Sequence, residues 1–362
     1  MRRFLKTAGW GLVLVIAGLC LLSSLVPPFL DRIYYRGPAS DHFDGARFFN
    51  PEDAGDTEAG ARRRGNFLLR MARGQDRAEW PKRVAVTPGV PPRRVAGSAM
   101  RVTWIGHATV LVQTAGLNIL TDPIWSEHAS PVPFAGPRRV RAPGIRFEDL
   151  PPIDLVLVSH NHYDHMDLAT LARLWRRDRP LIVTSLGNDT ILRSAGIAAR
   201  ALDWRQAARL RPDVDVTVAR NHHWGSRWFT DRNRALWSAF VVRLPGGNIF
   251  FAGDTGMGNG AWVREAALQG PYRLAILPIG AYAPRDVMKK NHIDPEEAVA
   301  VFEALRPARA LGVHWGTFQL TFEPIDEPRR RLAAALRRER IDAERFVATD
   351  VGQSFDVPPI AR

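Results

Sequence analysis

Cysteine is almost absent from this chain of 362 residues. The single copy, Cys20, lies inside an apolar N-terminal segment. An intrachain disulfide is therefore excluded, and no thiolate metal site can exist in the rest of the sequence. Any metal ion bound beyond that segment must be held by nitrogen and oxygen ligands.

Lysine is nearly as scarce, with only Lys6, Lys82, Lys289 and Lys290. The 50 basic residues are thus mostly arginine, and they exceed the 37 acidic residues to give a net charge of +13. Such an excess favours an anionic partner, either a lipid surface or a nucleic acid. Arginine-rich coding with solvated side chains explains the same excess equally well, so charge alone does not select a function.

Charge is also absent from residues 7–30, which directly follow Arg2, Arg3 and Lys6. A stretch of this length can span a bilayer as a helix, and its basic flank belongs on the cytoplasmic side. We therefore expect segment 1–30 to be an uncleaved, single-pass transmembrane anchor that leaves the remaining chain in the periplasm of a bacterium. The alternatives are a cleaved signal peptide, which would normally end in an Ala-x-Ala-like site, and a lipoprotein signal.

The remaining chain has the composition of a globular protein, with 46% hydrophobic and 24% charged residues overall. Residues 31–99 are rich in Gly, Pro, Arg and Asp, and we expect an extended arm with short helical pieces near 61–71. From 100 to 358, strand and helix patterns mix without a regular βαβ order. This mixed order of strands and helices predicts an α/β domain in which two sheets pack together with helices outside.

Apolar segments of strand length recur after residue 100, and most end in polar or glycine-containing loops. The expected strands are residues 101–105, 110–113, 117–120, 153–158, 181–184, 214–219, 248–252, 274–277, 310–313 and one within 347–355. Helices are expected at 168–175, from 294 to 305 and at 327–340. The second begins with an N-cap acid, Asp294, then Pro295 at the first helical position and Glu297 at the third.

The run from Ser159 to His165 carries three imidazoles and one aspartate directly after an expected strand. Neutral imidazole nitrogen and carboxylate oxygen are standard zinc ligands. Because they alternate, His160 and His162 can place both rings on one side of an extended turn. Asp164 and His165 fall on a tighter bend and could face a second ion about 3.5–4 Å away. The run therefore predicts a two-metal loop rather than a histidine-rich surface loop.

Three further polar residues follow buried strands later in the chain: His223, Asp254 and His314. Each lies where an apolar strand meets a glycine-containing loop, which is a normal position for a side chain delivered to a cleft. Taken singly, each is more typical of a structural histidine or a capping aspartate. Together with the preceding run they complete a set of metal ligands.

The ordered pattern His-x-His-x-Asp-His, then His, Asp and His, resembles the metallo-β-lactamase superfamily. Within it the chain is similar to the N-acylphosphatidylethanolamine-hydrolysing phospholipase D family. The stretches that carry this resemblance are residues 103–109, 120–124, 159–167, 223–224, 250–256, 278–282, 292–298 and 314–318. They extend over roughly residues 100 to 355.

The resemblance implies a four-layer αβ/βα sandwich with two zinc ions, although manganese or iron would also suit these ligands. It implies that one ion is held by His160, His162 and His223, the other by Asp164, His165 and His314, and that Asp254 bridges both. Asp164 and Asp254 are also expected to be catalytic. Asp122 and His107 would lie behind the ligands and hold them, although Asp122 also suits a simple turn before proline.

The activity implied by the resemblance is hydrolysis of N-acylphosphatidylethanolamine to N-acylethanolamine and phosphatidic acid, by a hydroxide that bridges the two metals. Tyr163 and His292 match residues that line the phospholipid headgroup in that family. The partners expected are a membrane phospholipid and a lipid bilayer, with no nucleic acid and with room for a homodimer. The chain departs from the animal enzymes at Pro133-Phe134, where they carry a polar-aromatic pair, and in its apolar N-terminus.

Other activities remain open at this point. A metal-dependent lactonase or another acyl hydrolase would use the same ligands, as in neighbouring branches of the superfamily. A nuclease would draw only on the basic charge. A lipid-binding scaffold without catalysis is disfavoured because all seven candidate ligand positions are filled.

Overall fold

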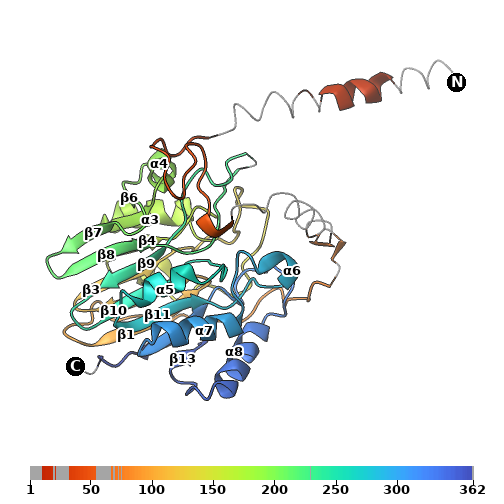
Figure 1. The fold of residues 1–362 in the computed structure, drawn as a ribbon. Coiled ribbons are helices and arrows are strands. Elements are labelled where there is room, and N and C mark those ends of the chain that lie inside the picture. Colours follow the sequence, from red (N-terminus) through yellow and green to blue (C-terminus); the bar gives the residue numbers. More distant parts are fainter. Residues whose placement is uncertain are drawn as a thin grey trace.

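Two sheets of seven strands each form the centre of the molecule in this computed structural model (Figure 1). The residues that it describes are 10–18, 21, 32–53, 67, 70, 71, 73, 74, 76–228 and 230–360. The first sheet has the order β14-β1-β2-β3-β4-β5-β6 and the second β13-β12-β11-β10-β9-β8-β7. The expected pair of sheets is therefore confirmed.

The first sheet is built mainly from strands that are buried on both faces. Its strands are β1 (Met100–Gly106), β2 (Thr109–Thr114), β3 (Leu117–Thr121), β4 (Leu155–Val158), β5 (Leu181–Ser185), β6 (Arg200–Leu202) and β14 (Ser354–Asp356). Strands β3 to β6 run parallel to one another. A continuous apolar run such as Leu155–Val158 suits a parallel strand that is covered on both sides.

The second sheet has the same size and a similar mixture of directions. Its strands are β7 (Ala207–Arg211), β8 (Val214–Ala219), β9 (Ala239–Arg243), β10 (Asn248–Phe251), β11 (Tyr272–Pro278), β12 (Arg309–Val313) and β13 (Phe346–Val347). Strands β10 to β13 are parallel, whereas β7, β8 and β9 pair antiparallel. The parallel strands of each sheet therefore share an edge at which their carboxyl ends meet.

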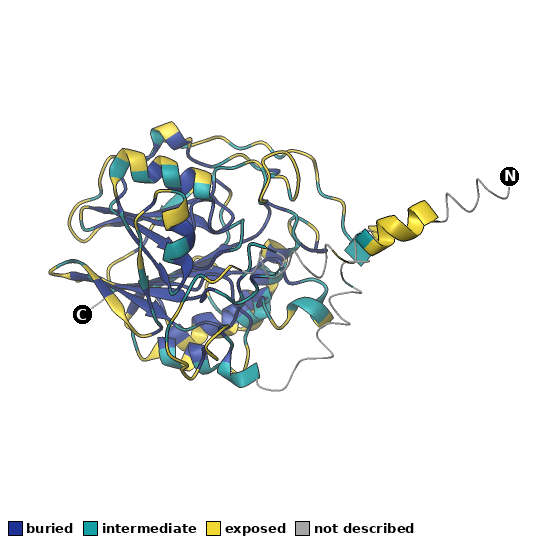
Figure 2. Cartoon of the chain, turned by 90° about the horizontal axis from the view of Figure 1, so that it is seen from above, coloured by how far each residue is buried: buried dark blue, intermediate teal, exposed yellow. Residues whose placement is uncertain are grey.

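Helices cover the outer face of each sheet, so that the sandwich has four layers. The helices are α3 (Leu168–Asp178), α4 (Asn188–Ser194), α5 (Ala261–Ala267), α6 (Arg285–Met288), α7 (Pro295–Leu305) and α8 (Glu327–Arg338), with short 3-10 turns η1 (Pro51–Asp53) and η2 (Phe147–Asp149). Leu171 and Leu174 of α3 pack with the outer face of the first sheet, and Phe302 of α7 packs with the second. Figure 2 shows the buried strands between the more exposed helices.

Helix α7 begins as its sequence predicts. The Asp294 side chain accepts a hydrogen bond from the Glu297 N–H, and the Glu297 side chain accepts one from the Asp294 N–H. These two reciprocal bonds complete the capping box, and proline at the first position needs no N–H there.

The end of the chain differs from the prediction. The single strand expected within 347–355 is two short strands, because a turn at Gly352 (φ 92°) carries the chain from β13 in one sheet to β14 in the other.

The sequence patterns missed β6, β7 and β9 and the helices α4, α5 and α6. These elements are short, and β7 and α6 carry charged residues that obscure their periodicity. The proposed boundaries at residues 30, 99 and 358 stay predictions.

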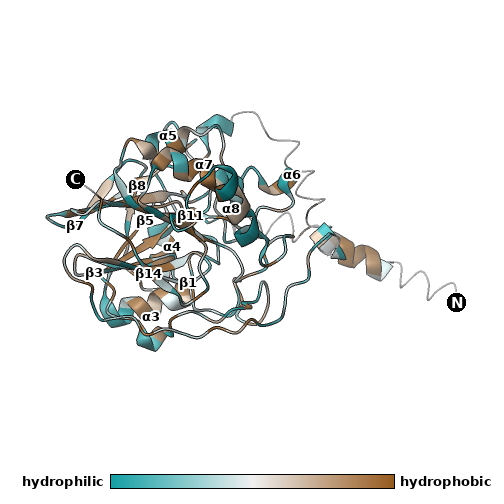
Figure 3. Ribbon diagram, turned by 90° about the horizontal axis from the view of Figure 1, so that it is seen from below, coloured by the Kyte–Doolittle hydropathy of each residue, from teal (hydrophilic) through white to brown (hydrophobic). Residues whose placement is uncertain are grey.

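The N-terminal segment is described in part. Residues 10–18 are helical, and the apolar side chains of Trp10, Leu12 and Leu14 are each more than 60% exposed. Figure 3 shows this helix in the hydrophobic colour, apart from the domain. Most of the anchor expected at 1–30 and most of the helical pieces expected at 61–71 lie outside the described residues. No helix in the described part of the chain combines the length and the hydropathy needed to cross a bilayer.

Candidate metal centre

The seven predicted ligands gather at one edge of the sandwich, because each follows a strand that ends there. His160, His162, Asp164 and His165 follow β4, His223 follows β8, Asp254 follows β10 and His314 follows β12. Five of them are at least 97% buried, while His162 and Asp164 are partly exposed toward a cavity. The sheet topology thus brings together residues that are up to about 150 positions apart.

His160, His162 and His223 form the first group. One ligand atom from each lies within 4.8 Å of the others. The His160 Nε2 and His162 Nδ1 atoms are 2.8 Å apart. The Nδ1 atom of His223 bonds to the carbonyl oxygen of Asn291 at 2.9 Å, so its Nε2 atom is left for the cluster.

Asp164, His165 and His314 form the second group, and their atoms have nearly equal spacings. His165 Nε2 lies 3.1 Å from His314 Nε2 and 3.3 Å from Asp164 Oδ2, and the last two atoms are 3.4 Å apart. Two ligands on one tetrahedral zinc ion, each about 2.0–2.1 Å from the metal, are about 3.3 Å apart. The spacing of these atoms therefore suits a single ion.

Asp254 lies between the two groups. Its Oδ2 atom is 3.1 Å from the Nε2 atoms of both His165 and His314, and 3.9 Å from His223 Nε2. Its other oxygen, Oδ1, is buried without a hydrogen-bond partner among the described residues. One oxygen of Asp254 thus lies near members of both groups, and the bridging role that the family resemblance implies for this carboxylate stays a prediction.

Unpaired buried atoms provide a test of whether metal ions fit here. His223 Nε2 and Asp254 Oδ1 both lack a hydrogen-bond partner in the part of the chain that the structure describes, although a buried polar atom without a partner costs about 1–3 kcal/mol. Both atoms are electron-pair donors that a cation would satisfy. The ligand set is all nitrogen and oxygen, as the scarcity of cysteine requires, and it suits zinc, manganese or iron.

Asp122, at the end of β3, holds the histidine-rich loop from behind. Its Oδ1 accepts from the Ser159 N–H at 2.7 Å, and its Oδ2 accepts from the Ser159 hydroxyl at 2.6 Å. The same Oδ2 bonds to His165 Nδ1 at 2.6 Å. That bond leaves His165 Nε2 for the second group, which is the usual orienting role of a carboxylate behind a ligating histidine. Burial of the fully enclosed Asp122 raises the pKa of its carboxyl.

His107, in the turn after β1, contacts the second group. Its Nε2 atom lies 2.8 Å from Asp164 Oδ2, and its ring packs 4.0 Å from that of His314. The His314 N–H donates to the His107 carbonyl oxygen at 3.0 Å. His107 therefore positions two members of the group at once.

The electrostatics of the cluster favour neutral imidazoles in the first group. Burial lowers the pKa of His162 to about 3, and burial with neighbouring rings holds the pKa values of His160 and His223 well below the usual range. Burial also lowers the pKa of His314, but Asp254 and Asp164 outweigh it and raise the value to about 9. Asp164 and Asp254 thus favour positive charge close to them.

A cavity of about 480 Å³, which we call the metal cavity, opens beside the ligands. Its walls combine the ligand edge with aromatic and apolar side chains, among them Phe67, Trp224, Val287, Met288 and Leu320. The volume is in the usual range for a small-molecule site, roughly 300–1,000 Å³. An apolar wall facing a polar cluster suits a substrate that is itself amphipathic.

Tyr163 and His292 both line this cavity, as the sequence predicts. The Tyr163 hydroxyl donates to the carbonyl oxygen of Arg227 at 2.6 Å, and the Arg227 guanidinium lies over the Tyr163 ring at 4.0 Å. The Tyr163 hydroxyl is therefore already engaged by the backbone. The His292 Nδ1 atom is 3.9 Å from Asp254 Oδ2 and has no hydrogen-bond partner among the described residues, and burial lowers the pKa of His292 to about 4.

Residues 50–53 contribute to the site from the N-terminal arm, which the sequence patterns did not indicate. The Asn50 side chain donates to the carbonyl oxygen of His223 at 3.0 Å and accepts from the Trp237 indole at 3.1 Å. Glu52 bonds to His222 Nδ1 at 3.0 Å and pairs with Arg220. These contacts join positions more than 150 residues apart, so no local signal could have revealed them.

Glu323 is a second residue that the sequence patterns missed. Its carboxylate is 95% buried and accepts from the N–H groups of Ala281 and Ala283 and from the Thr321 hydroxyl. These bonds hold the loop after β11, where Ala281 has a left-handed backbone (φ 59°) and lines the cavity.

The Pro133-Phe134 pair, at which the sequence departs from the animal enzymes, does not line the metal cavity, and Phe134 is 80% exposed.

Comparisons with known proteins place this arrangement in a family. Residues 117–315 match the family model described as the beta-lactamase superfamily domain. The chain is 36% identical over 271 residues to "N-acyl-phosphatidylethanolamine-hydrolyzing phospholipase D 1" of Caenorhabditis elegans, which covers 72% of this chain and 76% of that protein. The chain belongs to the N-acylphosphatidylethanolamine-hydrolysing phospholipase D family of the metallo-β-lactamase superfamily.

Two further comparisons have lower sequence identity. A "UPF0173 metal-dependent hydrolase" of Nitratidesulfovibrio vulgaris is 28% identical over 245 residues, which are 64% of this chain and 87% of that one. The isothiocyanate hydrolase from Delia radicum gut bacteria aligns with a TM-score of 0.56 at 21% identity, over 71% of this chain and 98% of that one. That likeness shows the shared sandwich fold. This member of the phospholipase D family is a metal-dependent hydrolase.

Proposed function

We propose that this hydrolase is a phosphodiesterase of the phospholipase D type that converts N-acylphosphatidylethanolamine into N-acylethanolamine and phosphatidic acid. The observation that carries the proposal is the convergence of all seven predicted ligands beside an amphipathic cavity. The relative from Caenorhabditis elegans, which its name describes as hydrolysing this lipid, supports the choice of substrate. The proposed cofactors are two zinc ions, and manganese or iron would suit the same donors.

The proposed ion sites follow the two groups, and Asp254 would bridge them. Two ions held there would acidify a water molecule and neutralise the charge that develops on the phosphoryl oxygens. The protein keeps the bridging oxygen of Asp254 in place through its contacts with His165 and His314. Asp164 is held in turn by His107, so neither carboxylate has to reorganise when a substrate binds.

A neutral imidazole at His292 would serve as a hydrogen-bonding partner for the headgroup. It lines the cavity, is almost fully buried, and has a free Nδ1 atom close to Asp254. The Tyr163 ring would pack against the apolar part of the bound lipid next to it. Tyr163 also lines two further cavities, of about 590 and 460 Å³, which offer room for acyl chains beyond the metal cavity.

The proposed setting is the membrane surface. Residues 7–30 carry no charge, and the described part of that segment is a helix with exposed apolar side chains. We propose that it anchors the protein in a bacterial inner membrane with the catalytic domain in the periplasm, and that the bilayer and its phospholipids are the partners. The net charge of +13 would favour anionic lipid. Nucleic acid is not among the proposed partners, and a homodimer stays a prediction.

The decisive experiment measures products from synthetic N-acylphosphatidylethanolamine in detergent micelles by mass spectrometry. The purified full chain should release N-acylethanolamine and phosphatidic acid, and Asp254→Asn should lower the rate by about 10²–10³-fold or more. Asp286→Asn, on the exposed face of α6, is the matched control and should keep the wild-type rate. Equal rates for wild type and Asp254→Asn would contradict the proposed mechanism.

Lactone substrates separate the proposal from its alternative. A metal-dependent lactonase or other acyl hydrolase would turn over N-acyl homoserine lactones or simple esters and leave the phosphodiester intact. That outcome would replace the proposed substrate while keeping the metal centre.

A further inference from the structure

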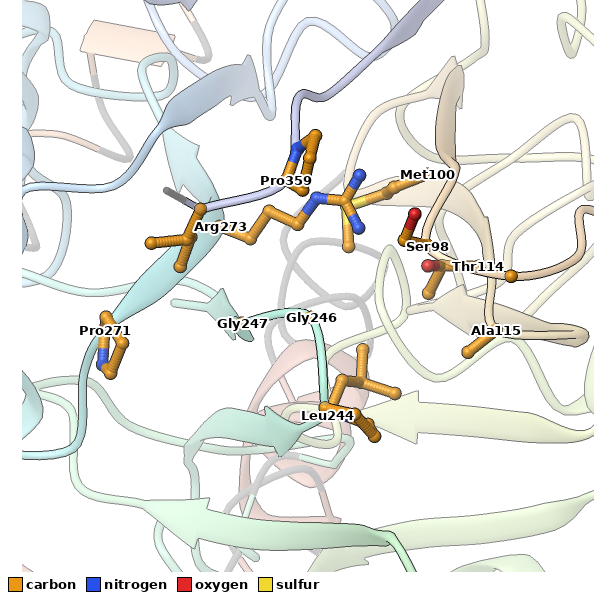
Figure 4. A pocket seen from close by; sticks show the side chains of 13 residues that line it. Ser98, Met100, Thr114, Ala115, Leu244, Gly246, Gly247, Pro271, Arg273 and Pro359 are labelled. Atoms are coloured by element: carbon orange, nitrogen blue, oxygen red, sulfur yellow. The ribbon is translucent and has the colours of Figure 1, made fainter. Parts of the chain in front are cut away.

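A second cavity, of about 610 Å³, lies at the end of the sandwich opposite the metal centre. Its walls come from the first residue of β1, the ends of β2 and β9, the start of β11 and the C-terminal segment (Figure 4). Strand β1 runs from this cavity at Met100 to the metal centre beyond Gly106, so the two sites are roughly 20 Å apart. We call it the distal pocket, and none of the seven predicted metal ligands lines it.

Arg273, near the start of β11, is the one charged residue among the described residues that line the distal pocket. It is 99% buried, and arginine is rarely buried to this extent without a carboxylate partner. Its Nε and Nη2 atoms donate to the carbonyl oxygens of Pro358 and Val357. Burial lowers the pKa of Arg273, and within the described part of the chain its hydrogen bonds go to carbonyl oxygens and not to a carboxylate.

The Nη1 atom is the guanidinium nitrogen of Arg273 that makes no hydrogen bond with the described residues. A methyl group added at Gly246 would come within 3.3 Å of it, so the glycine in the turn between β9 and β10 leaves the space beside this atom open. Figure 4 shows the guanidinium reaching across the pocket toward Met100 and Ser98. A buried guanidinium with a free donor facing a cavity is a ready partner for the oxygens of an anion.

The remaining walls indicate what such an anion would carry. They are mostly apolar or glycine backbone, with Met100, Leu244, Pro271, Pro359 and Ile360 among them, and none of the described lining residues is acidic. A volume of about 610 Å³ is far larger than an inorganic phosphate or sulfate ion requires. One guanidinium in an apolar pocket therefore suits a molecule with one anionic head and an apolar body.

We propose that the distal pocket binds a single-chain amphiphile with a carboxylate or phosphate head, with Arg273 holding the head and the apolar walls holding the chain. This site is independent of the proposed activity, because it shares no residue with the metal cavity. The carboxylate of a fatty acid and the phosphate of a single-chain phospholipid offer the same chemistry to the guanidinium, so the experiment has to distinguish them.

Direct binding to the full chain in the presence of zinc is the first measurement. The probes are dodecanoate, dodecyl phosphate, dodecanol and inorganic phosphate alone, each titrated by calorimetry. The three probes with a dodecyl or dodecanoyl chain are kept below the concentrations at which they aggregate. At least one of the two anionic amphiphiles should bind about tenfold or more tightly than dodecanol, because the head gains charge-assisted hydrogen bonds. The tighter of the two identifies the preferred head, and inorganic phosphate alone should bind weakly.

Variants and crosslinking locate the binding. Arg273→Met keeps an unbranched apolar stem without the guanidinium and should remove the preference for an anionic head. Arg209→Met, at an exposed arginine on β7, should retain it. Ser98→Trp leaves Arg273 in place but fills the pocket from an exposed loop, so it should weaken all the amphiphiles even if Arg273→Met folds poorly. A diazirine analogue of dodecanoate should crosslink to peptides containing residues 97–100, 244–247 or 358–360.

Three results would overturn the proposal. The first is no preference for an anionic head in the wild type. The second is wild-type affinity in both Arg273→Met and Ser98→Trp. The third is crosslinking confined to peptides of the metal cavity, such as those containing Tyr163 or His292.

Discussion

Strained backbone and buried hydrogen bonds hold the individual residues of the metal centre. His107, Asp122 and His314 each have a left-handed backbone, with φ angles of 55°, 30° and 65°. Such a conformation costs roughly 1–3 kcal/mol for a residue with a side chain, and it is kept only where the surroundings impose it. Here the His314 N–H bonds to the His107 carbonyl, and the Asp122 N–H bonds to the Leu157 carbonyl. All three strained positions lie in turns that deliver ligands or their supports.

Asp122 should control metal affinity although the sequence does not make it a ligand. Asp122→Asn replaces the oxygen that orients His165, so affinity for zinc should fall by about 10–100-fold in a chelator-competition titration. Asp178→Asn is the matched control. Both carboxylates accept a backbone N–H at an end of β4, Asp178 from Ile153 before the strand and Asp122 from Ser159 after it, but only Asp122 also bonds to His165. Equal zinc affinity in Asp122→Asn and wild type would show that the carboxylate only supports the turn.

At the scale of elements, strand direction explains why the ligands meet. Strands β10, β11 and β12 are parallel, so Asp254, the 279–281 loop and His314 leave the second sheet at one edge. Helix α7 fixes the neighbouring loop that carries His292, because its N-cap, Asp294, directly follows Ile293, whose N–H bonds to the Thr255 carbonyl. The position of His292 therefore depends on where α7 begins.

The two helices α7 and α8 provide a matched pair for testing that cap. Asp294 caps α7 with its side chain, whereas Asp326 precedes α8 and makes no such bond. Asp294→Ala should lower the free energy of unfolding by about 1–2 kcal/mol, and Asp326→Ala should change it by less than about 0.5 kcal/mol. Urea denaturation of both variants checks this, and similar losses in the two would show that the capping bond adds little to stability.

At the scale of the whole molecule, the arm from residue 32 to 53 is part of the folded unit. Phe43 and Phe48 are at least 98% buried in the core between the sheets. His42 stacks on Trp204 at 4.4 Å and bonds to Asp203 at 2.8 Å. Since Asn50 then reaches the backbone of His223, the arm joins the core to the metal centre.

The docking of the arm should depend on pH through His42. Burial lowers the pKa of His42, but hydrogen bonds to Asp203 and Asp41 outweigh it and raise the pKa above its usual 6.5. A raised pKa in the folded state means that the protonated ring stabilises the fold fully below pH 6.5, and that this contribution is lost as the pH rises through the folded-state pKa. His42→Gln should therefore cost about 1–3 kcal/mol at pH 6 and less at pH 9.

Urea denaturation of wild type and His42→Gln at both pH values checks this expectation. The difference in unfolding free energy between the two proteins isolates His42 from other titrating groups. His222 is one such group: burial lowers its pKa, but Asp53 and Glu52 outweigh burial and raise it. A difference that stays constant between pH 6 and pH 9 would contradict a charged His42.

Much of the fold and of the candidate site could be predicted from local sequence, because the patterns involved are local. Apolar runs of strand length marked most strands, and the capping residues at Asp294 marked the start of α7. The spacing of His160, His162 and His165 after β4 indicated a metal site before any contact was known. Strand periodicity, helix capping and clustered ligands all depend on neighbours within a few residues.

Only the tertiary structure decided which distant residues complete each site. The contact of Asn50 with His223, the division of 347–355 between two sheets, and the pocket around Arg273 all join segments far apart in the chain. Such contacts depend on how the two sheets and the arm pack, and packing leaves no periodic mark in any one segment. The sequence by itself therefore determined the chemistry of the metal donors, and the packing of the sandwich decided their supports and the second cavity.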